Sequence, residues 1–329
     1  MKGLDCGTGN FVCAAEKGIK LQRNSFLTID KSTTTTKQLK LLKVPFVEID
    51  NQLHIVGRKA FEYAQVFGNA ELKRPMSKGL LNPTEQHAFP VLKVIMQELL
   101  GKPNNDGGAE KVVYCVPGKP IDQEREVEYH QDVLKDIIES LGFEARPINE
   151  AVALGLAGLA DDGLTGIAIS MGAGMCNIAI MYAGMSALQF SVAKGGDWID
   201  ENVSRDCGIQ PAKAQYIKEG GDYTIDPAST EERSREQQAV KTYYEVLIRY
   251  LMANIAKQFE SEDMPNFPNA VPIVVGGGTS MVNGFVEVFK EQFQQKQFPL
   301  EISSIRHAEE PLTAVARGCL VDAQLEEED

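Results

Sequence analysis

The stretch that decides the fold lies in the middle of the chain and reads Ala168-Ile-Ser-Met-Gly-Ala-Gly-Met-Cys-Asn-Ile-Ala-Ile180. Two apolar runs flank a turn with two glycines, a pattern that predicts strand, tight turn and strand. Gly3-Leu-Asp-Cys-Gly-Thr-Gly-Asn-Phe-Val-Cys13 repeats this pattern. A hairpin with two glycines at its bend therefore occurs once in each half of the chain. The aligned pairs are Asp5 with Ser170, Gly7 with Gly172, and Gly9 with Gly174.

Strands and helices alternate around these two hairpins. We predict a buried strand at 111–116, a helix from about 121 to 141, and an alanine-rich helix from Glu150 to Ala160 with Asn149 as its N-cap. A long amphipathic helix is expected at about 231–259, and the apolar strand 271–275 leads through Gly276, Gly277 and Gly278 into a helix ending near Phe293. Mixed sheets covered by helices follow, so the expected class is α/β with two lobes.

Composition limits the function. The 33 Lys and Arg against 46 Asp and Glu give a net charge of −13, the wrong sign for a protein that coats nucleic acid. No stretch approaches the ~20 apolar residues of a membrane helix, and no signal peptide or amphipathic extension precedes the first strand. Six scattered cysteines and four scattered histidines show no metal-ligand spacing. We therefore expect a cytoplasmic protein without direct nucleic-acid binding, and membrane attachment is not supported.

Three glycine-rich turns follow apolar strands, at 5–9, 170–174 and 276–278. Glycine lets main-chain N–H groups approach an anion closely, and several such turns at strand ends favour phosphate binding over simple β-turns. Asp5 is placed to hold Mg²⁺ through its water shell, or merely to cap the turn. Glu150 opens a helix and could orient a water for attack on a phosphate, or simply favour the helix dipole.

These motifs together resemble the actin and heat-shock-chaperone ATPase superfamily, and bacterial actins of the MreB type most of all. Residues 4–10 and 169–175 resemble the two phosphate motifs, 149–153 and 310–318 the two connecting helices, and 272–284 the adenosine motif. Residues 74–79, 115–117 and 194–200 also occur in MreB order.

The resemblance implies a two-lobed actin-like ATPase fold, with a duplicated mixed-sheet core and Mg-ATP or Mg-ADP in the cleft between the lobes. Lobe I would comprise 1–145 and about 308–329, with an insertion at about 20–75; lobe II would comprise 146–307, with a reduced insertion at about 197–265. Glu150 would position the water, and Asp5 would be the carboxylate on the magnesium side. The implied nucleotide-binding residues are Gly7, Thr8, Gly9, Asn10, Gly172, Ala173, Gly174, Met175, Gly195, Gly196, Lys218, Glu219, Gly276, Gly277, Gly278 and Met281.

Two departures from the family pattern matter. Ser170 stands where the second phosphate motif normally opens with an aspartate, so one carboxylate near the metal is missing and slow hydrolysis is expected. The segment between Gly195 and Phe259 offers mainly helices and a loop, so the subdomain that forms one side of MreB filament contacts is reduced.

The first functional hypothesis is a cytoskeletal ATPase that assembles head to tail into filaments when nucleotide binds. A non-polymerising chaperone-like or assembly ATPase is the alternative, and an ATP-binding module without turnover is kept open by Ser170. A small-molecule kinase is less favoured, because no substrate aspartate can be identified. An adaptor protein, the cargo and the choice between ATP and GTP stay open.

Overall fold

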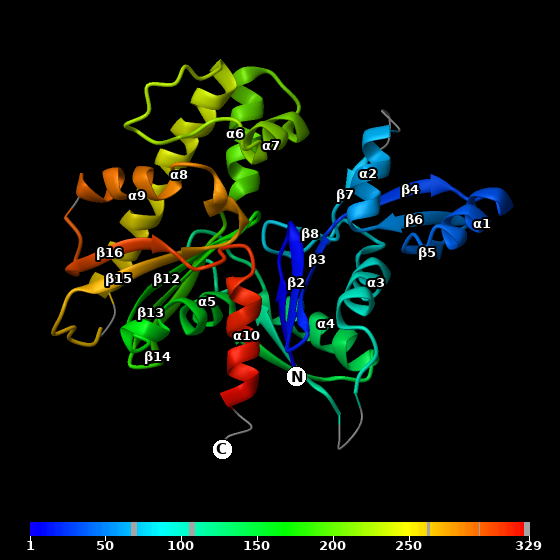
Figure 1. Ribbon diagram of the computed structural model, residues 1–329, viewed down its shortest axis with the longest axis horizontal. Helices are drawn as coiled ribbons and strands as arrows, with labels where there is room; N and C mark the ends of the chain where they lie inside the picture. The colour runs from blue at the N-terminus through cyan, green and yellow to red at the C-terminus, as the bar shows by residue number, and fades with distance from the viewer. Residues whose placement is uncertain (67–70, 105–108, 262–263, 296, 326–329) are drawn as a thin grey trace. The chain divides into compact units, whose positions relative to one another are not determined.

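The computed structural model describes residues 1–66, 71–104, 109–261, 264–295 and 297–325 (Figure 1). The turn-forming residues 102–108 predict a loop and the acidic residues at 325–329 predict a tail, and of these segments 105–108 and 326–329 lie outside the described residues. The chain divides into two compact units. Unit 1 holds Met1–Val116, Glu126–Ile148 and Cys319–Asp329, and unit 2 holds Pro117–Arg125 and Asn149–Gly318.

Each unit is built on a five-stranded mixed sheet. In unit 1 the order is β11 (Glu144–Asn149), β10 (Lys111–Val116), β1 (Lys2–Cys6), β2 (Asn10–Ala15), β3 (Gly18–Arg23). β1 runs parallel to β10 and antiparallel to β2, which in turn is antiparallel to β3. The predicted strand 111–116 is confirmed.

The sheet of unit 2 repeats this topology. Its order is β14 (Met185–Val192), β13 (Cys176–Tyr182), β12 (Gly166–Met171), β15 (Val271–Gly276), β16 (Ile302–His307). β12 is antiparallel to β13 and parallel to β15, just as β1 is antiparallel to β2 and parallel to β10. The duplicated mixed-sheet core that the resemblance implies is confirmed.

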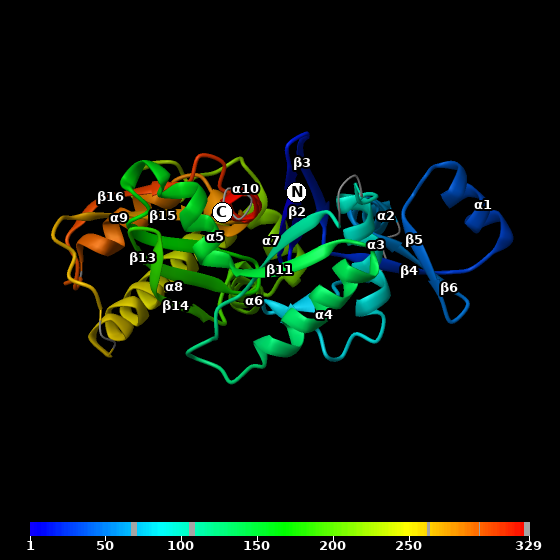
Figure 2. The same cartoon turned by 90° about the horizontal axis from the view of Figure 1, so that it is seen from below.

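In unit 1, α3 (Ala88–Leu100) and α4 (Val127–Ser140) lie side by side and share a core with the sheet (Figure 2). α10 (Ala314–Leu325) reaches the same sheet, because the Cys319 thiol lies against the Leu4 carbonyl and Asp322 pairs with Arg146.

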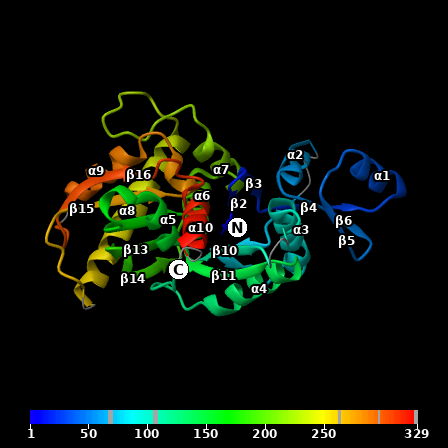
Figure 3. The same cartoon turned by 60° about the horizontal axis from the view of Figure 1, so that its bottom comes forward.

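A small antiparallel sheet belongs to the same unit, with the order β5 (Phe46–Ile49), β6 (Gln52–Val56), β4 (Phe26–Asp30), β7 (Leu72–Lys73). Figure 3 shows α1 (Thr33–Leu41) beside β5 and β6, with α2 (Arg58–Val66) nearby. The hairpin of β8 (Met76–Ser77) and β9 (Leu80–Leu81) follows.

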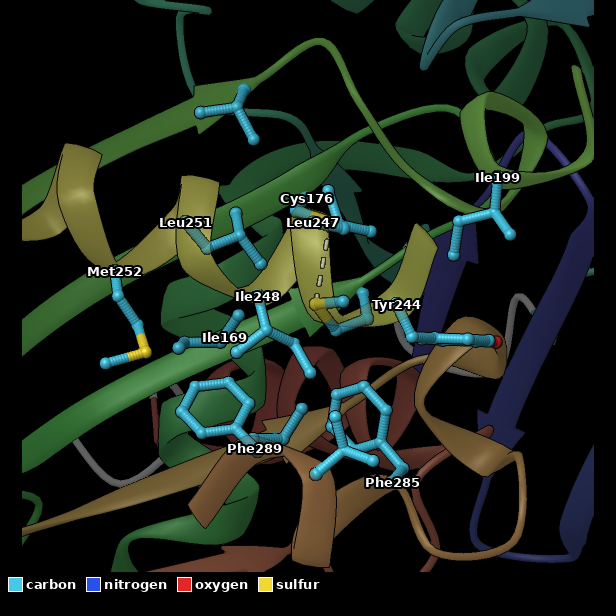
Figure 4. Close-up of a cluster of buried hydrophobic side chains, with 14 of the residues drawn as sticks. Ile169, Cys176, Ile199, Tyr244, Leu247, Ile248, Leu251, Met252, Phe285 and Phe289 are labelled. Carbon is cyan, nitrogen blue, oxygen red and sulfur yellow. Dashed lines mark hydrogen bonds between the residues drawn. The ribbon is translucent and has the colours of Figure 1, made fainter. Parts of the chain in front are cut away.

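In unit 2, helices cover both faces of the sheet. α5 (Glu150–Gly158) packs closely on β12 and β13, where a Cβ at Gly155 would collide with Met181. α6 (Gly196–Cys207), α8 (Arg235–Ser261) and α9 (Phe285–Gln294) share the core of the other face with Ile167 and Ile169 (Figure 4). Successive side chains of β12 point to opposite faces of the sheet. Ala168 therefore faces α5, whereas Ile167 and Ile169 face α8.

Two predicted helix starts were wrong. The helix expected from residue 121 begins at Val127, because the preceding segment extends beside β14: the Ile121 amide donates to the Ser191 carbonyl, and the Asp122 carboxylate accepts from the Ala193 amide. The long helix expected from residue 231 begins at Arg235. Ser234 ends the loop there by a capping box with Gln237, each side chain accepting from the other residue's amide.

Candidate functional site

The first glycine turn joins β1 to β2 within unit 1. The Asn24 side chain donates to the Gly7 carbonyl at 3.1 Å, and the Asn24 amide donates to the Gly9 carbonyl at 3.0 Å. A Cβ at Gly7 would lie 2.6 Å from the Asn10 carbonyl oxygen, so only glycine fits there. Asn24 therefore holds two carbonyls of the turn, and the shape of the turn requires glycine at position 7.

Two side chains of this first turn already have partners. Thr8 is buried, and its Oγ1 accepts a hydrogen bond from the Gly79 amide at 3.0 Å, which ties the turn to the β8–β9 hairpin. The Asp5 carboxylate accepts from the Cys115 thiol at 3.3 Å. Thr8 can therefore meet a ligand through its main chain more readily than through its hydroxyl.

The second turn joins β12 to β13 within unit 2, and the start of α6 holds it. The Gly172 amide donates to the Met175 carbonyl at 2.9 Å. The Gly172 carbonyl accepts from the Gly196 amide at 3.0 Å and from Thr279 Oγ1 at 2.9 Å. The Ala173 carbonyl accepts from the Asp197 amide at 2.8 Å. All the carbonyls named here are thus directed into the protein.

Four main-chain N–H groups of the two turns have no acceptor among the described residues. In the described part of the chain, the amides of Thr8 and Gly9 in the first turn, and of Ala173 and Gly174 in the second, donate no hydrogen bond. Thr8 and Gly174 are buried, where an unpaired N–H is costly. Successive free amides in a glycine turn can bind an anion, and each unit has two such amides in its turn.

Further glycines pack directly against the second turn. A Cβ at Gly195 would lie 2.5 Å from the Gly172 carbonyl oxygen, and one at Gly277, whose φ is +87°, would lie 2.5 Å from the Met171 carbonyl oxygen. The close approach requires glycine at both positions. The structure therefore brings together three sequence-predicted segments, 172–175, 195–196 and 276–278. Met281 ends the short 3-10 helix Gly278–Met281 that follows and is 51% exposed.

Glu150 lies beside the second turn at the first residue of α5. Asn149 is the N-cap, as expected, and its side chain accepts from the amides of Ala151 at 2.9 Å and Val152 at 3.2 Å. Glu150 Oε1 accepts a hydrogen bond from the Ser170 hydroxyl at 2.7 Å. A further hydrogen bond reaches the carboxylate from Asn177, whose Oδ1 accepts from the Gly118 amide.

Burial and hydrogen bonding act in opposite directions on Glu150. Burial raises the pKa of its carboxyl, and the hydrogen bonds from Ser170 and Asn177 lower it, with burial the larger effect. Sequence reasoning recognised Ser170 only as a missing carboxylate. The register pairs Ser170 with Asn177 on adjacent strands, so both side chains can converge on Glu150.

Lys218 and Asp200 form a buried ion pair behind this turn. Lys218 Nζ lies 2.6 Å from Asp200 Oδ2 and 2.9 Å from the Gly196 carbonyl, and both side chains are 7% exposed. Burial raises the pKa of Asp200 to about 6, although Lys218 opposes the shift. Lys218 therefore anchors the first turn of α6, whereas the neighbouring Glu219 is exposed and accepts from Gln215.

A metal site made by the protein alone is absent from the described residues, where no three His, Cys, Asp or Glu side chains are grouped to hold a cation. Mg²⁺ bound together with a nucleotide needs only one or two carboxylates besides phosphates and water, so such a site would not require a group of three protein ligands. The described part of the chain also contains no helix that is both long and apolar enough to cross a membrane.

This fold, with one glycine hairpin in each unit, is the fold of actin-like proteins of the MreB type. Among solved structures, the chain is similar to the double helical filament of MamK, at 19% identity and a TM-score of 0.73, with 98% of each chain covered. A non-polymerising MamK mutant bound to AMPPNP gives 19% identity and a TM-score of 0.62, also covering 98% of each chain. MreB5 of Spiroplasma citri bound to ADP gives 16% identity and a TM-score of 0.68, covering 99% of this chain and 97% of that one.

The sequence itself places the chain within one family of this fold. The volactin family model matches residues 1–323, and the chain belongs to that family. Curated proteins offer no significant match.

Proposed function

We propose that this protein is an actin-like ATPase that binds Mg-ATP, hydrolyses it slowly and assembles into filaments. One observation carries the proposal: two topologically equivalent hairpins, one in each unit, present main-chain N–H groups that lack acceptors in the described part of the chain. Phosphate oxygens are the acceptors that such turns suit. The solved relatives support this assignment, since two were determined with AMPPNP or ADP and one as a filament.

Each hairpin would bind phosphate oxygens through its main chain, with residues 7–10 in unit 1 and 172–175 in unit 2. Asp5 would hold Mg²⁺ through water, and Glu150 would orient the attacking water. The adenosine would lie against Gly276, Gly277, Gly278 and Met281, with Glu219 on the side of the base or ribose. Lys218 would act indirectly, by holding the Gly196 carbonyl and the Asp200 carboxylate at the start of α6.

Hydrolysis would be slow because Ser170 supplies a hydroxyl where a second carboxylate would stabilise the metal. Main-chain groups bind phosphate whatever residue stands at position 170, so binding would persist. The presence of Ser170 in place of this carboxylate also favours the second candidate function, an ATP-binding module without turnover.

One experiment separates these functions. The purified protein is mixed with Mg-ATP, Mg-ADP or no nucleotide, and light scattering, sedimentation and phosphate release are recorded together. Nucleotide-dependent scattering with slow release supports the filament. Release without scattering would indicate a chaperone-like or assembly ATPase, and binding without release would indicate the module. Absence of nucleotide binding at millimolar concentration would refute the proposal.

A further inference from the structure

The end of α1 exposes two adjacent leucines. Leu41 is 81% exposed and Leu42 is 63% exposed, whereas Leu39 is 2% exposed and packs with Leu27 and Leu53 in the core of the small sheet. Figure 1 shows α1 at the end of this small sheet. Because Leu39 already supplies the contact that holds the helix, the two exposed leucines are not needed to attach it.

Three lysines surround these leucines. Lys37, Lys40 and Lys43 are exposed and form no ion pair within the described residues. Lys31, by contrast, pairs with Glu48 and is occupied. We name the group Lys37, Lys40, Leu41, Leu42 and Lys43 the α1 tip. Favourable interaction with the helix dipole accounts for Lys40 in the last turn, but not for the leucines.

The backbone holds the α1 tip in one conformation. The Leu42 amide donates to the Gln38 carbonyl at 2.9 Å, the Lys43 amide to the Lys40 carbonyl at 3.1 Å, and the Val44 amide to the Leu39 carbonyl at 2.9 Å. Lys43 takes a left-handed conformation with φ 51°, and Val44 is buried again directly after it. A preformed surface loses little conformational entropy when a partner covers it.

Charge indicates the kind of partner. Lys37, Lys40 and Lys43 give the α1 tip a charge of +3 in a chain of −13, so the rest of the chain carries −16. A surface of exposed leucines ringed by lysines complements an acidic one. Bulk charge opposes an anionic membrane or nucleic acid but makes another copy of this chain an abundant source of acidic surface.

From this complementarity we propose that the α1 tip is a contact between copies, in which Leu41 and Leu42 are covered by an acidic surface of a second molecule. The inference rests on the proposed self-assembly and names the surface used. Because the tip would meet a different surface on the next copy, the contact is heterologous and can propagate along a filament.

The test compares paired variants by sedimentation and light scattering with Mg-ATP. We expect Leu41→Ser/Leu42→Ser to raise the critical concentration at least about tenfold, since two leucines would no longer be buried on assembly. Lys40→Glu/Lys43→Glu should do the same and abolish the salt dependence contributed by this contact. The matched controls are Met185→Ser, which removes a side chain 69% exposed in unit 2, and Lys119→Glu/Lys290→Glu, which makes the same change in net charge there.

A second readout uses carbodiimide, which joins a lysine directly to a contacting carboxylate. With a mixture of isotope-labelled and unlabelled copies, Lys40 or Lys43 should form cross-links to the other copy, and these should disappear in the leucine variant. Nucleotide affinity and thermal melting should match wild type, because the tip lies outside the nucleotide motifs.

The outcomes separate this inference from the proposed function. If the wild type assembles and both tip variants assemble equally well, the α1 tip inference is wrong while the filament stands. If the wild type binds nucleotide but never assembles, both the filament and the tip contact are wrong. Binding of the tip to vesicles of phosphatidylglycerol, lost in the leucine variant, would overturn the choice of partner.

Discussion

Ser170→Asp tests whether a missing charge limits turnover. The Ser170 hydroxyl lies 2.7 Å from Glu150 Oε1, so an aspartate there would bring a second carboxylate about as close to Glu150. Two like charges about 3 Å apart repel by roughly 5 kcal/mol at an effective dielectric constant of about 20. Without a cation the pair would therefore share a proton, as neighbouring carboxylates do. With Mg²⁺ present, both can ionise.

The expected gain follows from this geometry. One preorganised electrostatic contact in a transition state is worth on the order of 3 kcal/mol, or about a hundredfold in rate. Phosphate release by Ser170→Asp should therefore rise by up to about a hundredfold with Mg-ATP. Since repulsion raises the pKa of the pair, the gain should grow as pH increases, and more Mg²⁺ should move that rise to lower pH.

The assay is phosphate release against pH at several Mg²⁺ concentrations, with nucleotide affinity measured in parallel. Ser170→Asn is the matched control, because its side chain has the size of aspartate without the charge. An equal gain in the asparagine variant would show that charge is not the cause. Unchanged release by the aspartate variant at saturating Mg²⁺ would refute the reasoning altogether.

Three further predictions use other parts of the structure. Glu150→Gln should abolish residual phosphate release while changing nucleotide affinity less than about threefold, measured by single-turnover kinetics and calorimetry; normal turnover would remove Glu150 from the mechanism. Gly318→Ala should destabilise the fold by about 1–3 kcal/mol or more in urea unfolding, because its Cβ would collide with the Ala153 carbonyl, whereas Gly221→Ala, in open space, should change little. Burial lowers the pKa of His130 to about 4 from an ordinary 6.5. Below pH 6.5 only the unfolded state takes up this proton, so the free energy of unfolding should fall by about 3 kcal/mol between pH 7 and 4, and His130→Asn should flatten that fall; an identical pH profile would contradict it.

The sheets were predictable because each hairpin combines two local signals that agree. Apolar residues on both sides of a glycine turn predict two paired strands, and the matched spacing predicts their repetition. Position 121 shows where local signals fail. The spacing of apolar residues from 121 onward continues the helical pattern of α4. Residues 119–121 nevertheless lie outside the helix, because their backbone pairs with Ser191 of β14. A contact between residues so distant in sequence leaves no periodic signal.

The candidate site was predictable to the extent that glycine identifies it. Gly195 and Gly277 are required by contacts with carbonyl oxygens of the second turn, and their type alone marked them. The role of Lys218 was not predictable in the same way. A lysine followed by a glutamate on a helix has the pattern of an exposed face, and only the packing of α7 (Pro211–Glu219) against α6 buries it beside Asp200.

The scaffold of the second turn does not depend on residue 170. Its shape comes from main-chain contacts, the Gly172 amide with Met175 and the Gly172 carbonyl with Gly196 and Thr279. Ser170 acts on Glu150 instead, through one hydroxyl hydrogen bond. The proposed phosphate binding by main-chain N–H groups and the proposed catalysis by side-chain charge would thus be separable. Substitutions at Ser170 should change the rate of hydrolysis by far more than they change nucleotide affinity.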